Sequence, residues 1–233
     1  MSKLAIVTAL EREVGELTKN YRRIEREYDG RKFTFFEHGD AVLVCGGIGL
    51  EAARRAAEAV IASYRPTLVQ SVGFAGALDA SMHVGDIISP AVVLDARDGS
   101  RVEIVGGEGT LVTFMTVAGA EQKQKLAQAY RAQAVDMEAA AVAAAAAAHG
   151  IRFTATKVIS DGLHFEMPET ARFIDARGGF RTAAFAAFVA LRPWLWRRVA
   201  MLASNSNHAA RALAEHLKAF RQPLNDAVEA KTT

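Results

Sequence analysis

The sequence has only one cysteine, Cys45, in 233 residues. One thiol cannot form an internal disulfide, so the fold must rely on its core, and this cysteine usage fits a reducing compartment. Long apolar runs are also lacking, because no stretch of about 18 uninterrupted apolar residues occurs. The apolar run at residues 4–7 is too short for a signal peptide. We therefore expect a cytoplasmic protein, with peripheral contact with a membrane as an alternative.

An excess of charge of either sign is missing as well. Lysine and arginine total 28 and aspartate and glutamate 26, which leaves a formal net charge of +2. This balance does not indicate a nucleic-acid surface and favours a small-molecule ligand. The six histidines form no His-Glu-x-x-His pattern and have no cysteine at ligand spacing. We expect no metal and no cofactor.

The apolar content of 51% is ample for one large core. We expect a single domain at residues 1–222 and a disordered tail at 223–233. Apolar runs of strand length alternate with segments of helical period, a pattern typical of an α/β fold. The sequence predicts three α/β/α layers around a central mixed sheet. The expected strands are residues 4–10, 33–37, 41–45, 67–72, 86–94, 111–117, 134–137 and 152–160.

Three acidic residues follow predicted strands. Glu13 lies in the first helical turn after the first strand, Glu138 lies where a strand passes into a helix, and Asp161 follows the last strand. Each acid alone is explained by the helix dipole or by an N-cap role. Ligands of open α/β sheets collect at the carboxyl ends of the strands, so the three acids together indicate one catalytic site.

Several short motifs carry a family resemblance. In their order along the chain, they resemble those of the purine nucleoside phosphorylase and methylthioadenosine/S-adenosylhomocysteine nucleosidase superfamily. The resemblance spans roughly residues 4–162. Its most specific part is the Asp-Met-Glu sequence followed by the Ser-Asp pair. The motifs are Val7-Thr8-Ala9-Leu10-Glu11-Arg12-Glu13-Val14, Gly47-Ile48-Gly49, Val72-Gly73-Phe74-Ala75-Gly76-Ala77-Leu78, Val84-Gly85-Asp86, Val135-Asp136-Met137-Glu138-Ala139 and Ile159-Ser160-Asp161.

This resemblance implies cleavage of the N-glycosidic bond of a purine nucleoside. Such a reaction gives the sugar oxocarbenium character and requires a proton or hydrogen bond on the departing purine. By similarity, Asp161 is the acid facing the purine N7, Glu138 accepts hydrogen bonds from the ribose diol, and Glu13 holds and activates the attacking water. Met137 is expected against the sugar, and backbone groups around Gly73 and Ser160 complete the pocket.

The nucleophile is either water or phosphate. Phosphorylases of the superfamily hold phosphate with arginines and a hydroxyl residue near the glycine motif, whereas Phe74 stands at the hydroxyl position here. Arg12, Arg54 and Arg55 remain candidates for supplying positive charge, although arginines in helices are usually solvated. The glutamate after the first strand is a nucleosidase-like feature. We therefore expect hydrolysis, with phosphorolysis as the alternative.

A middle segment and the C-terminal part together carry a narrower resemblance. The compressed segment 95–125 and the sequence Arg192-Pro193-Trp194 are similar to hopanoid-associated nucleosidases, which remove adenine from the lipid nucleoside adenosylhopane. Trp194 and Trp196 stand beside cationic residues, as in a helix at a bilayer interface, although a core or dimer helix explains them too. The superfamily resemblance also implies a homodimer or a higher homo-oligomer.

Two rival functions come from other classes. Residues 47–52 satisfy G-x-G-x-x-A after a predicted strand, as a dinucleotide-binding fold requires. The next strand, however, offers no acidic residue for the ribose hydroxyls of NAD. The second rival is a nucleoside-binding module without catalysis. The substitution Glu13→Gln distinguishes the two, because an enzyme should lose turnover and retain its ligand, whereas a binding module has no turnover to lose.

Overall fold

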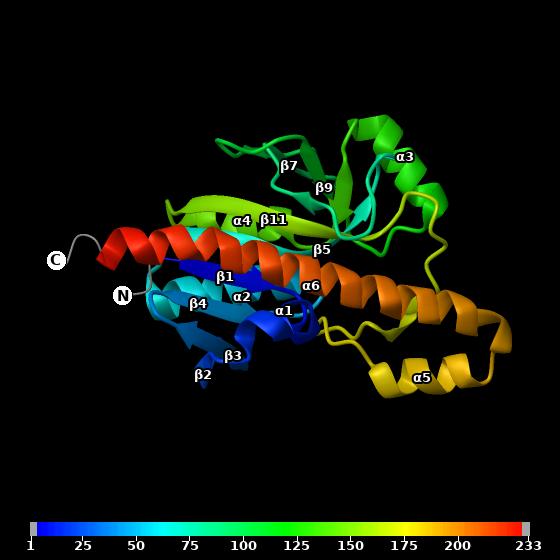
Figure 1. The fold of residues 1–233 in the computed structure, drawn as a ribbon, viewed down its shortest axis with the longest axis horizontal. Coiled ribbons are helices and arrows are strands. Elements are labelled where there is room, and N and C mark those ends of the chain that lie inside the picture. Colours follow the sequence, from blue (N-terminus) through cyan, green and yellow to red (C-terminus); the bar gives the residue numbers. More distant parts are fainter. Residues whose placement is uncertain (1–3, 230–233) are drawn as a thin grey trace.

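The computed structural model describes residues 4–229, with side chains as far as residue 219. The chain folds into three α/β/α layers around one mixed sheet, as Figure 1 shows. The predicted fold class is therefore confirmed. In the same view, the first and the last of the described residues lie at one end of the molecule.

The centre of the sheet is made of parallel strands. β1 (Leu4–Thr8) pairs in parallel with β4 (Ala41–Cys45) on one side and with β5 (Leu68–Ala77) on the other. β5 also pairs in parallel with β11 (Arg152–Asp161), and its last residues pair antiparallel with β10 (Ala134–Asp136). The end of β5 is therefore the point at which the sheet divides and at which several strand ends come together.

The outer strands differ from the sequence expectation in several places. Besides the differences described next, Arg101–Glu103 is a strand that was not expected, and the strand expected at 111–117 is found at Thr110–Thr113. The predicted hairpin is present as β3 (Arg31–His38) and β4, but β3 also pairs with β2 (Arg22–Tyr28). β2 was missed because no residue of it is buried and its sequence carries no apolar alternation. The single strand expected at residues 86–94 is two strands separated by Pro90, which has no N–H to donate. The remaining strands are β6 (Ile87–Ile88), β7 (Val92–Asp95), β8 (Arg101–Glu103) and β9 (Thr110–Thr113).

Helices cover both faces of the sheet. α2 (Leu50–Tyr64) and α4 (Ala139–Ala148) pack on one face, where their alanines are buried against β1, β4 and β5. α1 (Glu11–Thr18) and α6 (Pro193–Glu229) pack on the other face. This arrangement explains the alanine-rich sequences of α2 and α4, since small side chains let the two helices approach closely.

The remaining helices lie toward one end of the molecule. α3 (Ala120–Tyr130) follows β9, the 3-10 helix η1 (Thr170–Phe173) follows β11, and α5 (Thr182–Ala190) precedes α6. Figure 1 shows α5 and the beginning of α6 projecting beyond the sheet, at the end opposite to the chain termini. Within the described residues, no helix has the length and hydropathy to cross a membrane.

The C-terminal tail lies partly outside the described residues. α6 runs as far as Glu229, so it includes residues that the sequence analysis placed in a disordered tail, and residues 230–233 are not described. The division into a domain at 1–222 and a tail remains a prediction.

Candidate active site

A cavity of about 410 Å³ opens at the carboxyl ends of β1, β5, β10 and β11. It draws its lining from segments far apart in the sequence. Six of the seven residues expected in the site line it, and Gly73 does not. The six are Glu13, Phe74, Met137, Glu138, Ser160 and Asp161.

Glu13 lies in the first turn of α1, directly after β1, and is 6% exposed. Its carboxylate turns back toward the strand, where Thr8 Oγ1 donates a hydrogen bond of 2.7 Å to Oε2. Burial raises the pKa of Glu13 above its usual value, and the hydrogen bond from Thr8 partly opposes this shift. A carboxylate with a raised pKa is a stronger base, as activation of water requires.

Gly73 does not line the cavity but leaves room for the side chain of Glu13. Its φ of 151° is one that residues with a side chain rarely adopt, and a Cβ atom added there would lie 2.8 Å from Glu13 Oε2. The absence of a side chain at Gly73 therefore lets the Glu13 carboxylate lie against β5.

Glu138 is the N-cap residue of α4 and faces the cavity from the end of β10. Its Oε1 accepts a 2.9 Å hydrogen bond from the Gly49 N–H, and its Oε2 accepts one of 3.2 Å from the Met137 N–H. Burial raises the pKa of Glu138 to about 7, and the neighbouring Asp136 carboxylate adds to the shift. Lys157 and the Gly49 N–H act in the opposite direction.

Lys157 does not line the cavity, but it is a buried cation that interacts with the carboxylates of the site and that the sequence analysis missed. It is 1% exposed on β11, and its Nζ forms a 2.8 Å ion pair with Asp136. Although burial alone would lower the pKa of Lys157, the carboxylates of Asp136, Glu138 and Glu13 raise it. A lysine within the apolar strand 152–161 was the available signal, because such a residue must find a buried anion.

Asp161 is the last residue of β11, where the pairing with β5 shifts register between Ile159 and Asp161. Such a β-bulge changes the direction of the side chains that follow it. Asp161 Oδ1 accepts a 2.7 Å hydrogen bond from Ser160 Oγ. Its Oδ2 accepts a hydrogen bond from Lys123 of α3, a second buried lysine that the sequence analysis missed.

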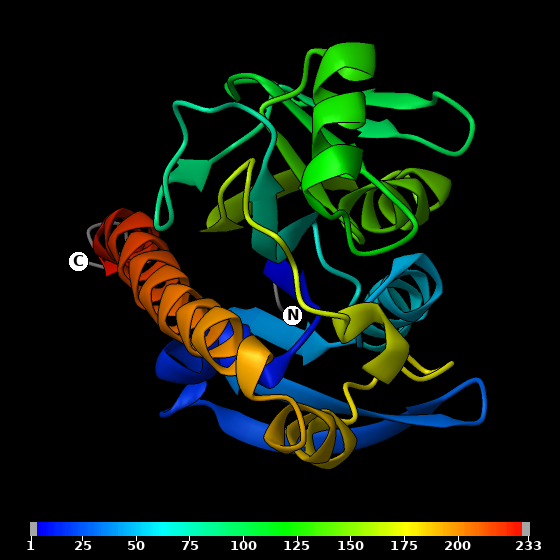
Figure 2. The same cartoon turned by 90° about the vertical axis from the view of Figure 1, so that its right-hand side faces the viewer.

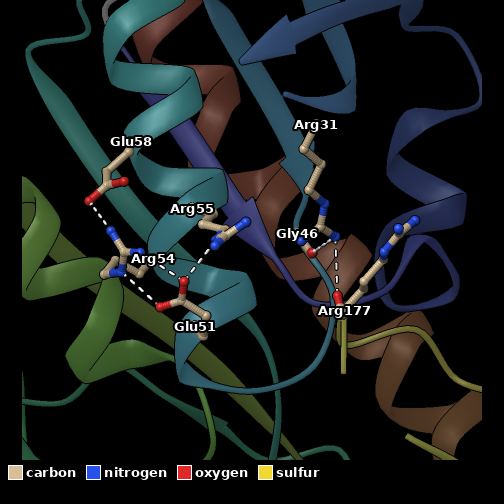
Figure 3. Close-up of polar contacts among 7 residues, drawn as sticks. All are labelled: Arg31, Gly46, Glu51, Arg54, Arg55, Glu58 and Arg177. Carbon is tan, nitrogen blue, oxygen red and sulfur yellow. Dashed lines mark hydrogen bonds and ion pairs between the residues drawn. The ribbon is translucent and has the colours of Figure 1, made fainter. Parts of the chain in front are cut away.

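The arginines proposed as sources of positive charge separate into two groups. Arg12 lines the cavity, with its guanidinium 5.6 Å from the centre of the Phe180 ring. Arg54 and Arg55 lie outside the cavity and bind the carboxylates of Glu51 and Glu58, as Figure 3 shows. These two arginines do not supply charge to the site, because their partners are surface glutamates of the same helix.

Arg31 fixes the segment that leads to the cavity wall. From β3, its guanidinium donates hydrogen bonds of 3.0 Å to the Gly46 carbonyl and 3.1 Å to the Arg177 carbonyl (Figure 3). This joins the end of β4 to the segment that continues into Phe180. The backbone at Arg177 is thereby held next to the end of β4.

The side of the cavity away from the sheet is mainly apolar. Phe180 and Phe185 line it from the α5 region, and Val199 and Leu202 line it from the first turns of α6. Figure 2 shows α6 crossing diagonally, with α5 below it. Leu202 lies in the cavity wall, whereas Trp194 and Trp196, at the start of the same helix, are 73% and 55% exposed.

The glycine motif of the dinucleotide-binding rival has another role in this fold. Gly47 and Gly49 adopt φ angles of 105° and 96° between β4 and α2. The Gly49 N–H, which a dinucleotide-binding loop would offer to a pyrophosphate, donates to Glu138. The motif thus orients a carboxylate of the cavity.

Comparisons with known proteins find relatives of this sequence and of this fold. A curated methylthioadenosine/S-adenosylhomocysteine nucleosidase of Staphylococcus epidermidis is 26% identical over 189 residues, which cover 66% of this chain and 81% of that protein. The structure of an Arabidopsis thaliana methylthioadenosine nucleosidase matches with a TM-score of 0.71 at 17% identity, covering 94% of this chain and 93% of that one. Futalosine hydrolase of Helicobacter pylori matches with a TM-score of 0.66 at 16% identity, over 93% and 96% of the two chains.

The family comparison extends over most of the chain. The family model described as the phosphorylase superfamily matches residues 3–116 and 108–191. The expected enzyme class, a nucleosidase or nucleoside phosphorylase, is confirmed by these matches. Because the matched residues make up well over half of the sequence, this chain belongs to the phosphorylase superfamily.

Proposed function

We propose that this protein hydrolyses the N-glycosidic bond of an adenine nucleoside. The observation that carries the proposal is the convergence of Glu13, Glu138 and Asp161 on one cavity. The carboxylates of Glu13 and Glu138 stabilise the positive charge that develops on the sugar, and Glu13 takes a proton from the attacking water. Glu138 accepts hydrogen bonds from the ribose diol. The Asp161 side of the cavity supplies the proton to the purine N7.

Water is proposed as the nucleophile because the cavity offers phosphate little positive charge, since the ammonium of Lys123 is already paired with Asp161. Arg12 is the only arginine in its lining among the described residues, and Phe74 replaces the expected hydroxyl residue. A phosphate dianion is usually bound by several cations and hydrogen-bond donors. Phosphorolysis is kept as the alternative outcome of the test below.

The proposed substrate carries an apolar group on the ribose 5′ carbon, as adenosylhopane does. This extension is supported by the apolar wall that α5 and α6 contribute, because an alkyl group gains free energy on entering such a surface. It is also supported by the exposed Trp194 and Trp196 on the same helix, next to Arg197 and Arg198. Tryptophan and arginine together favour the interface of a bilayer. Peripheral membrane contact through these tryptophans is part of the proposal.

The experiment compares adenosine, methylthioadenosine and adenosylhopane, with and without phosphate, by following adenine release and the sugar product. Free sugar in phosphate buffer is the expected product. Formation of a ribose 1-phosphate would show that the reaction is phosphorolysis and not hydrolysis. Failure to release adenine from any of the three nucleosides would refute the proposal. Preference for adenosine over both 5′-substituted nucleosides would remove the apolar-substituent part alone. Preference for methylthioadenosine over the lipid nucleoside would restrict the substituent to a small apolar group.

The membrane part has a separate test. Sedimentation with vesicles containing anionic lipid should recover the wild type, and Trp194→Ser combined with Trp196→Ser should lower the bound fraction severalfold. Val105→Ser, which changes an exposed apolar residue elsewhere, is the control. Equal binding by all three proteins would contradict this role. The proposed homo-oligomer is tested by analytical ultracentrifugation, where a monomer at micromolar concentration would contradict it.

A further inference from the structure

We propose that the proton transferred to the departing purine starts on Lys123 and reaches N7 through Asp161. Resting on the proposed function, this inference concerns the leaving-group side of the reaction. It makes Lys123 and Asp161 a single proton-donating pair, in which the lysine ammonium is the source of the proton.

The pair is enclosed within the protein. Lys123 is 1% exposed and Asp161 is 4% exposed, although both side chains also line the cavity. Lys123 Nζ donates to Asp161 Oδ2 and, at 2.8 Å, to the carbonyl of Gly162. Taking two charges out of water is costly, so a buried ion pair is weak evidence for a stabilising role. Its position at a reaction cavity favours a chemical role.

The fold leaves a space for this pair on β5. A Cβ atom added at Gly76 would lie 2.9 Å from Lys123 Cε and 3.1 Å from Asp161 Oδ2. These distances are too short for an unstrained contact, so only glycine accommodates the pair in its present position. The lysine is thus held between β5 and the end of β11.

The hydrogen bonds fit an ion pair of a carboxylate and an ammonium. Asp161 accepts from Ser160 Oγ at one oxygen and from Lys123 Nζ at the other, as a carboxylate does. A carboxylate has no proton to give to N7. A lysine ammonium has three N–H donors, and Lys123 uses two of them in the described structure.

The proposed step balances as follows. One N–H proton of Lys123 moves to Asp161 Oδ2, and from there to purine N7 as the bond between N9 and C1′ breaks. The bonding electrons stay with the purine, which leaves as neutral adenine, while Lys123 becomes a neutral amine. Water adds to C1′ and gives a proton to Glu13. The enzyme returns to its starting state when Glu13 releases this proton to solvent and Lys123 takes up a proton from solvent.

The test uses two substrates with different leaving groups. Adenosine, or whichever adenine nucleoside the wild type cleaves best, needs a proton on its base. 4-Nitrophenyl ribofuranoside releases a stable phenolate, which needs none. Lys123→Met should slow adenine release by about 10²–10⁴-fold, the range of general-acid contributions, and change nitrophenolate release by less than about tenfold.

Lys123→Arg separates proton donation from charge. Arginine preserves the positive charge but does not lose its proton in proteins, so this variant should also lose adenine release and keep nitrophenolate release. Lys125→Met, on the exposed side of the same helix, is the matched control and should behave as the wild type with both substrates. Thermal unfolding checks that each variant is folded.

The outcomes distinguish this inference from the proposed function. If the wild type releases adenine and Lys123→Arg releases it as fast, the proposed role of Lys123 is overturned, whereas the proposed function stands. Equal losses with both substrates in a folded Lys123→Arg variant would also overturn it, because they indicate a structural role. If Lys123→Met does not fold, Lys123→Arg decides. A wild type that releases nitrophenolate but no adenine from any nucleoside would instead refute the proposed function.

Discussion

Replacing Lys157 by methionine should destabilise the fold in a way that depends on pH. The ammonium of Lys157 is 1% exposed, pairs with Asp136 at 2.8 Å, and is attracted by Glu138 and Glu13. Methionine has a similar length but no charge, so the substitution leaves three carboxyl groups without their shared cation. Breaking a buried pair in this way typically costs about 3–5 kcal/mol. This is a large part of the roughly 5–15 kcal/mol that stabilises a typical domain.

The pH dependence identifies the cause. The pKa of Glu138 is already raised to about 7 and that of Glu13 is raised, and loss of Lys157 should raise both further. A carboxyl group with a raised folded-state pKa binds its proton more tightly in the folded state, so its contribution to stability is present at low pH and is lost as pH rises through that pKa. The loss of stability in Lys157→Met should therefore be larger at pH 8 than at pH 5.5.

Urea unfolding of wild type and Lys157→Met at these two pH values measures the effect. Lys125→Met is the control, because its exposed pair with Glu121 contributes at most about 1 kcal/mol. A variant as stable as the wild type at pH 8 would refute the reasoning. So would a loss of the same size at both pH values, since it would show that packing rather than charge is responsible.

Three further predictions concern catalysis. Glu13→Gln should lower kcat for adenine release by about 10²–10⁴-fold, while the ligand affinity measured by calorimetry stays within about tenfold of the wild type. Glu11→Gln, at an exposed neighbour, should leave kcat unchanged. Equal effects of the two substitutions would argue against Glu13 as the base. The wild-type kcat/KM should fall as the pH falls through about 7, because protonated Glu138 no longer accepts both hydrogen bonds of the diol, and Glu138→Gln should remove that limb; a flat wild-type profile between pH 6 and 8 would contradict this. Gly73→Ala should reduce turnover at least tenfold because its Cβ displaces the Glu13 carboxylate, and wild-type kinetics in a folded variant would show that the space behind Glu13 is not required.

The fold was largely predictable because its central strands are apolar runs of strand length. β1, β4 and β11 carry that signal, as do the alanine-rich helices α2 and α4. β2 carries none, since its residues are stabilised by pairing with β3 at the edge of the sheet and are not buried. Its position depends on a neighbour that local sequence does not reveal.

The candidate site was predictable on its acidic side and not on its basic side. Glu13, Glu138 and Asp161 stand at strand ends within recognisable motifs, so topology alone brings them together. Lys123 lies on α3 two residues from the exposed Lys125, and nothing in the sequence separates one lysine from the other. Only the three-dimensional contacts of the Lys123 side chain with Gly76 of β5 and Asp161 of β11 show which of them is buried.

The two glycines of β5 have a consequence for how the reaction geometry is maintained. Gly73 makes room for Glu13, the proposed base for water, and Gly76 makes room for Lys123 and Asp161, the proposed proton donors to the purine. Three residues of a strand span about 10 Å, and this length is set by bond lengths and angles. The spacing between the two halves of the chemistry is thus built into one stretch of backbone, and residues at the mouth of the cavity can change to suit other substrates without altering it.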